Sequence, residues 1–130
     1  MPAQPLELIL GRQFVDTLSL PAFLVDPEGN LLFYNEPAEV IFGLNFGETG
    51  GMRVEEWATM FTPYDDQGNP LPPEELPLVK TLQDLKPNSG SFYIHSLTGK
   101  EIHIEVTSFP IIARQDRFLG AMAIFWKIDP

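Results

Sequence analysis

The hydrophobic pattern of the chain changes period once, and this change limits the folds that the chain can adopt. Up to about residue 85, apolar residues recur mainly at the spacing of helices, interrupted by one pair of short apolar runs near the N-terminus. Beyond that point they alternate with polar residues, as in strands that bury one face. A chain with this order of elements is expected to pack its helices against a sheet.

Turn formers and capping residues divide the pattern into elements. Pro27-Glu28-Gly29-Asn30 is a turn between two apolar runs. Asn35 is a good N-cap for the next helix, which has Pro37 in its first turn and which Gly43 can end. The segments 47–51 and 63–73 are expected to be loops, the first of them flexible. In order, we expect a helix over 6–18, strands over 22–26 and 31–34, helices over 36–43, 53–61 and 74–85, and strands over 91–96, 101–109 and 119–128.

These elements predict an α+β fold. The connections between the last three strands are short, so these strands should form an antiparallel meander. The chain of 130 residues has room for one domain. We therefore expect an N-terminal amphipathic flanking helix within residues 1–18 and a single domain over residues 19–130.

The composition excludes several classes of function. The chain has 18 acidic and 8 basic residues and a net charge of -10, so nucleic acids and anionic membranes would repel it. It has no cysteine, which excludes disulfides, thiolate nucleophiles and cysteine-bound metal clusters. No apolar run is long enough to span a bilayer, and the N-terminus lacks a signal-like segment. We expect a cytoplasmic protein with neither a nucleic-acid nor a membrane partner.

Several stretches, in this order along the chain, resemble segments of the PAS (Per-Arnt-Sim) domain family of the bacterial sensor type. The resemblance covers about residues 17–128 and implies a five-stranded antiparallel sheet in the order 2-1-5-4-3, with helices covering one face. It also implies a cavity between the sheet and the helices. The stretches are Leu24-Val25-Asp26-Pro27-Glu28-Gly29-Asn30, Tyr34-Asn35-Glu36-Pro37-Ala38, Pro70-Leu71-Pro72-Pro73-Glu74-Glu75-Leu76-Pro77-Leu78, Thr98-Gly99-Lys100-Glu101-Ile102, Phe109-Pro110-Ile111 and Leu119-Gly120-Ala121-Met122-Ala123-Ile124-Phe125.

The same resemblance implies a sensory module for signal transduction. Such a module binds a small molecule or a partner protein and passes a conformational change to an effector, as in histidine kinases of two-component systems. It is not an enzyme, and no catalytic constellation is identified in the sequence. The family usually closes with an Asp-Ile-Thr-like motif, and the matching stretch here is Lys127-Ile128-Asp129, so we expect the effector to lie outside this chain. The alternative is a ligand-free interaction and homodimerisation module with a filled core.

The residues restrict the ligand that a pocket could hold. Without cysteine, the chain can form neither the flavin adduct of light-oxygen-voltage relatives nor the thioester of photoactive yellow protein relatives. The expected helix over 74–85, which usually supplies a histidine in haem-binding relatives, contains none, and this argues against haem. A non-covalent flavin or a small apolar metabolite stays open, and Trp57 is either its stacking partner or a core residue. The predicted pocket residues are Phe23, Phe33, Phe42, Trp57, Phe61, Leu78, Leu82 and Ile104.

The two histidines lie on adjacent predicted strands, and the turn between these strands decides where His95 points. A two-residue turn pairs His95 with Ile102 and makes His95 a polar contact in the pocket. A three-residue turn pairs His95 with His103 and points Phe92 and Ile94 into the core; apolar matching favours this second register. No third ligand is fixed near the histidines by spacing, so no metal site is predicted.

The N-terminal helix carries an apolar row of Leu6, Leu10 and Phe14 at four-residue spacing. A helix of this length is not stable alone, so the row must dock on its own sheet or on another molecule. In PAS relatives, such a flanking helix often forms a parallel dimer contact. We therefore expect a homodimer that forms through these residues, with an intramolecular cap as the alternative.

Overall fold

The computed structural model describes residues 6–128. Residues 1–5 of the expected flanking segment and Asp129 of the closing stretch lie outside the described residues. None of the helices within residues 6–128 is long and apolar enough to cross a membrane. In chain order, the elements are α1 (Leu6–Thr17), β1 (Ala22–Val25), β2 (Leu31–Tyr34), α2 (Glu36–Phe42), α3 (Phe46–Thr49), α4 (Val54–Met60), the 3₁₀ helix η1 (Pro73–Glu75), α5 (Pro77–Asp84), β3 (Asn88–His95), β4 (Glu101–Ala113), the 3₁₀ turn η2 (Arg114–Asp116) and β5 (Arg117–Lys127).

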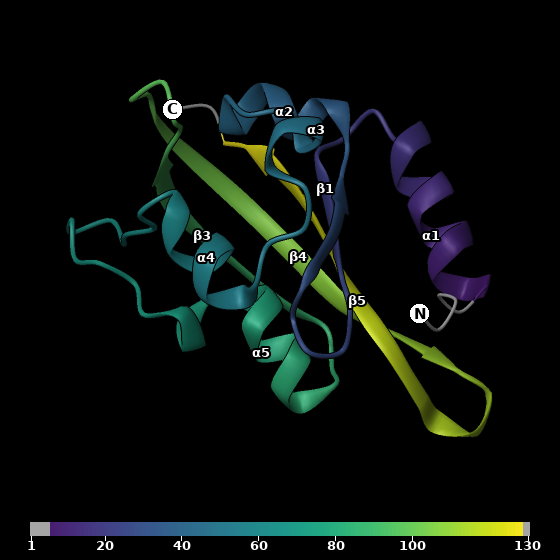
Figure 1. The fold of residues 1–130 in the computed structure, drawn as a ribbon. Helices are drawn as coiled ribbons and strands as arrows, with labels where there is room; N and C mark the ends of the chain where they lie inside the picture. The colour runs from purple at the N-terminus through teal and green to yellow at the C-terminus, as the bar shows by residue number, and fades with distance from the viewer. Residues whose placement is uncertain (1–5, 129–130) are drawn as a thin grey trace.

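The strands form one five-stranded antiparallel sheet in the order β2-β1-β5-β4-β3, as expected. The chain leaves the sheet after β2 and returns at β3, and the helices between these strands cover one face (Figure 1). The hairpin of β4 and β5 is the longest part of the sheet and extends beyond the other strands (Figure 1). This topology places β5 at the centre of the sheet, between β1 and β4.

Two apolar clusters lie on opposite faces of the sheet. The larger one lies between the sheet and the helices α2 to α5, and the smaller one lies under α1. Figure 1 shows α1 on the opposite side of the sheet from α4 and α5. Alternation along β1, β4 and β5 separates the two clusters. On β4 and β5, the residues that face the larger cluster are Ile102, Ile104, Val106, Ala121, Ala123 and Phe125.

Helix α1 packs on its own sheet, but through a different face from the predicted apolar row. Leu8 and Val15, two helical turns apart, are buried against the sheet, with 3% and 0% of their surfaces exposed. The predicted residues Leu6, Leu10 and Phe14 remain 65%, 53% and 54% exposed. The helix therefore has two apolar faces, and the intramolecular contact uses the one that the four-residue row does not mark.

The buried Asn35 side chain joins three elements at the edge of this contact. Its Oδ1 atom accepts hydrogen bonds from the backbone N–H of Ala22 (3.0 Å) and of Ala38 (3.2 Å), the second of which is the predicted N-cap bond. Its Nδ2 atom donates to the carbonyls of Val15 and Leu20, both at 2.9 Å. The end of α1, β1 and the start of α2 are thus held by one amide, and all its polar capacity is used.

The segment expected to be a flexible loop, 47–51, instead begins inside a short helix. The backbone N–H of Phe46 donates to the Glu39 carboxylate at 2.7 Å, and this bond fixes the start of α3. Gly50, with φ of 60°, ends the helix. The expectation was wrong because the glycines marked the end of the helix rather than a structureless segment.

The last helix and the last strands also differ from their expected bounds. Helix α5 begins at Pro77 rather than at residue 74, because Leu76 is extended and a proline without an N–H suits the first helical position. Strand β3 begins earlier, at Asn88, and β4 continues past Pro110 to Ala113. Helix α5 is anchored on β4 by a buried bond between the hydroxyls of Thr81 and Ser108 at 2.7 Å.

Candidate functional site

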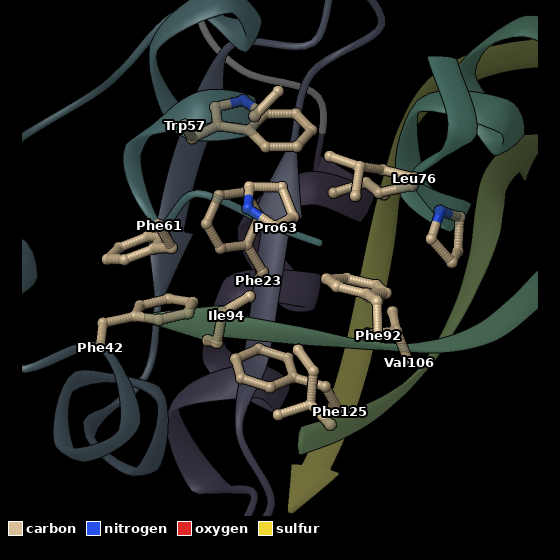
Figure 2. A pocket seen from close by; sticks show the side chains of 15 residues that line it. Phe23, Phe42, Trp57, Phe61, Pro63, Leu76, Phe92, Ile94, Val106 and Phe125 are labelled. Carbon is tan, nitrogen blue, oxygen red and sulfur yellow. The ribbon is translucent and has the colours of Figure 1, made fainter. Parts of the chain in front are cut away.

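An apolar cavity of about 90 Å³ lies between the sheet and the helices that cover it. The side chains that form its wall come from α2, α4, α5, the segment after α4 and every strand except β2 (Figure 2). None of these lining residues carries an ionisable group. They are Phe23, Phe42, Trp57, Ala58, Phe61, Pro63, Leu76, Pro77, Leu78, Phe92, Ile94, Ile104, Val106, Ala123 and Phe125.

Aromatic rings form one side of the cavity. Phe42 stacks on Phe61 and on Phe125, with ring centroids 4.3 Å and 5.3 Å apart, and Phe23 meets Trp57 edge-on at 5.2 Å. Figure 2 shows these rings around a common space. Stacked and edge-to-face pairs are the arrangements that aromatic rings prefer, so these rings pack favourably with one another in the wall.

The one polar atom of Trp57 is engaged in the fold. Its indole N–H donates to the carbonyl of Gly29, in the turn between β1 and β2, at 2.7 Å. This bond fixes the ring edge-on to Phe23 rather than leaving a donor free for a ligand. The cavity wall therefore presents only apolar surface to a ligand. It selects against charged molecules, because a charged ligand would find no partner for its charge in the wall.

Most of the predicted pocket residues lie in this wall, but two do not. The predicted residues that line it are Phe23, Phe42, Trp57, Phe61, Leu78 and Ile104. Phe33 lies on the opposite face, under the guanidinium of Arg12 on α1, which is 4.6 Å from the ring centre. It pairs with Leu24 across β1 and β2, and both side chains belong to the smaller cluster. Leu82 packs on the larger cluster outside the cavity wall.

Sequence reasoning missed the residues that close the cavity. Val106 and Phe125 share the inward face with Ile104, so strand alternation was a signal that pointed to them. Pro63 and Pro77 gave no such signal, because their segments meet at the cavity only in the folded chain.

The cavity does not fit a flavin or a haem. An apolar cavity of about 150 Å³ is known to hold benzene, and sites for larger ligands span roughly 300–1,000 Å³. At about 90 Å³, this cavity is smaller than that one and suits a molecule no larger than benzene. The wall also lacks a histidine or methionine to bind iron and a free polar group to bind the edge of a flavin ring.

His95 does not line the cavity. It pairs with Glu101, so neither of the two expected registers is correct. The turn has three residues, 97–99, closed by a bond of 2.9 Å from the Ser96 N–H to the Lys100 carbonyl, and it lies one position earlier than the expected three-residue turn. The faces nevertheless agree with the second register, since Phe92 and Ile94 point into the core. His95 is exposed on the other side of β3, where its Nδ1 atom lies 3.0 Å from the Thr62 hydroxyl.

Comparisons with known proteins support this architecture. The PAS domain of a protein from Colwellia psychrerythraea is 17% identical, with a TM-score of 0.65 and coverage of 93% of this chain and 96% of the other. The PAS domain of BvgS from Bordetella pertussis is also 17% identical, with a TM-score of 0.66 and coverage of 95% and 87%. A LOV protein from Rhodobacter sphaeroides is 13% identical, with a TM-score of 0.72 and coverage of 95% and 68%. These likenesses concern the fold alone.

A search of the curated proteins found no match. A family model described as "PAS domain" matches residues 19–127, which is most of the chain. The sheet order, the helices on one face and this match agree, and the chain therefore belongs to the PAS domain family.

Proposed function

We propose that this PAS domain is a cytoplasmic sensory module whose signal is a small, uncharged, apolar molecule held in the cavity. In this proposal, residues 19–130 form the sensor domain and residues 1–18 form a flanking segment that passes the change to an effector. The observation that carries the proposal is the cavity itself, whose wall is apolar throughout and whose volume is about 90 Å³. Domains of this family occur in sensor proteins, and a PAS domain from a two-component sensor histidine kinase shares the fold.

Strand β5 supplies a short route from the cavity to α1. Ala123 and Phe125 of β5 line the cavity, while Met122 of the same strand packs in the cluster under α1. Leu8 of α1 is buried in that same cluster. A ligand that moves β5 by a fraction of an ångström would therefore shift the sheet surface on which α1 packs, because packed elements transmit small displacements.

The test is a titration of the uniformly ¹⁵N-labelled protein with benzene, followed by amide chemical shifts. The proposal predicts saturable shifts at cavity residues such as Leu78, Val106 and Ala123, with smaller shifts in α1. Benzoate serves as the matched charged control and should leave these amides unchanged. The proposal fails if benzene produces no saturable shift at these residues, or if benzoate binds there equally well.

A second function, homodimerisation, is favoured by the exposed face of α1. Leu6, Leu10 and Phe14 keep more than half of their surfaces exposed, although α1 is already docked on its sheet. Ile9 is also 41% exposed beside them. Large apolar side chains gathered on one helix face are typical of an interaction surface. We propose that this face meets the same face of a second copy, independently of whether the cavity holds a ligand.

The dimer is tested by replacing Leu10 and Phe14 together with glutamate and measuring the mass in solution by light scattering. Both side chains are exposed, so the variant should fold and become monomeric at concentrations where the unmodified protein is a dimer. Gln83→Glu adds a charge to an exposed position of α5, on the other side of the sheet (Figure 1), and should leave the dimer intact. An unchanged mass in the double variant would exclude this face as the contact.

A further inference from the structure

A second hollow lies on the other side of the wall formed by Ala58 and Pro63. It is an open groove of about 470 Å³ between the end of α4, the segment 62–71 and the connection between β3 and β4. Its volume is within the range of small-molecule sites. Unlike the cavity, it is lined by polar as well as apolar groups, so its ligand must be of another chemical class.

The segment after α4 is held in place as an addition to the sheet. Tyr64 and Tyr93 exchange two backbone hydrogen bonds of 2.9 Å, and the N–H of His95 donates to the carbonyl of Phe61 at 2.9 Å. This pairing covers part of the edge of β3 and holds one wall of the groove in a fixed position. The groove is thus built from hydrogen-bonded backbone rather than from a free loop.

Thr62 adopts an unusual backbone conformation at the centre of this segment. Its φ is 45°, in the left-handed region that a β-branched residue rarely adopts. The conformation places the Thr62 hydroxyl 3.0 Å from Nδ1 of His95, at the groove. Strain of this kind persists only where the surroundings hold it, and it is often found at functional sites.

The Glu101 carboxylate lies at one end of the groove, fixed by a hydrogen bond. The Tyr64 hydroxyl donates to Oε2 of Glu101. Desolvation and this hydrogen bond raise the pKa of Tyr64 to about 12, so the hydroxyl keeps its proton at neutral pH. The Tyr64 ring is fixed between Tyr93 and His95, with centroids 5.4 Å and 5.0 Å away. Glu101 therefore keeps a defined position with a second oxygen, Oε1, free to accept.

The charge around the groove favours a cation. Glu101 is the one charged residue among the described residues that line it, and no lysine or arginine is among them. The whole chain has a net charge of -10, which attracts cations and repels anions. Ala58, Pro63, Pro70 and Leu71 supply apolar surface beside the carboxylate.

We propose that this groove binds a small organic cation, an ammonium group carried on an apolar body. The ammonium group donates to Oε1 of Glu101, beside the Tyr64 hydroxyl, and the hydrocarbon part lies on Pro63, Pro70 and Leu71. The groove and the cavity have different walls except at Ala58 and Pro63. The proposal for the groove is therefore tested separately from the proposal for the cavity ligand.

Phenethylamine is the probe for this site, and 2-phenylethanol is its uncharged counterpart. Titration of the ¹⁵N-labelled protein should give saturable amide shifts at Thr62, Tyr64, Gly68 and Leu71 with the amine. The alcohol should bind about fivefold more weakly, because an ion pair at an exposed carboxylate contributes up to about 1 kcal/mol. Equal binding of the two probes, or no saturable shift at these residues, would overturn the proposal.

The carboxylate is tested by Glu101→Gln, with Glu105→Gln as the matched control. Both changes remove one negative charge from β4, but Glu105 lies outside the groove. The glutamine side chain can still accept the Tyr64 hydrogen bond, so the geometry should be kept. We expect Glu101→Gln to weaken amine binding by about fivefold and Glu105→Gln to leave it within about twofold. Equal losses in both variants would mean that the amine follows the general negative charge, and the site would be refuted.

Discussion

Replacing Ala123 by valine adds two methyl groups to the wall of the apolar cavity. Ala123 lies on the central strand β5, is 4% exposed and faces the cavity. Valine suits a strand, so the backbone of β5 should accept the change. The new methyl groups enter the cavity instead of displacing Phe23 or Phe125.

The size of the void sets the expected gain in stability. Empty volume enclosed in a core costs about 24 cal/mol per Å³, so a cavity of about 90 Å³ costs at most about 2 kcal/mol. Burying two methyl groups contributes at most about 1.6 kcal/mol. After the loss of side-chain freedom and imperfect fit, we expect the free energy of unfolding to rise by about 1 kcal/mol.

Urea unfolding measures this gain as a higher midpoint with an unchanged slope. Ala121→Val is the matched control, because Ala121 lies two residues away on the same face of β5 but outside the cavity wall, with 0% of its surface exposed. Overpacking there should lower the free energy of unfolding by about 1–3 kcal/mol. The reasoning is refuted if Ala123→Val destabilises the fold as much as Ala121→Val does.

Three further predictions concern hydrogen bonds in the fold. Trp57→Phe leaves the buried carbonyl of Gly29 without its donor and should lower the free energy of unfolding by about 1–3 kcal/mol, measured in urea. Asn35→Ala removes four hydrogen bonds and should cost about 3 kcal/mol, and it should increase amide hydrogen exchange in α1; unchanged exchange would refute the role given to this amide. Tyr64 should ionise near pH 12 by ultraviolet absorbance, because desolvation and the Glu101 carboxylate raise its pKa. A tyrosine in the unfolded chain ionises near pH 10, so the stability that the raised pKa of Tyr64 contributes is present below pH 10 and is lost between pH 10 and 12. Ionisation of Tyr64 near pH 10 in the native protein would contradict this prediction.

Local patterns predicted the fold well because each element carries its own signal. The change of period separates the helices from the last strands, and the cap at Asn35 and the proline at the start of α5 are visible in the sequence. The glycines around α3 carried a weaker signal, since a glycine marks the end of a helix as readily as a loop. The bond from Glu39 that starts this helix spans seven residues and has no local pattern.

The candidate site was only partly predictable, because its parts meet through long-range packing. The aromatic residues on α2, α4 and β1 could be placed in the core from their spacing. Phe33 could not be assigned to a face of the sheet from the sequence. Strand β2 is short and apolar throughout, so no alternation of polar and apolar residues shows which side chains point to the cavity. The position of His95 depended on the length and the position of one turn, and the three-residue turn of the structure lies one position earlier than the alternative of that length.

The direct measurement of the central claim is a crystal structure of the protein under xenon pressure, because xenon occupies apolar cavities without needing polar partners. The account predicts one xenon site in the cavity, against Phe23, Trp57 and Phe125, and loss of this site in Ala123→Val. Xenon bound only elsewhere, or side chains that fill the cavity, would contradict the account.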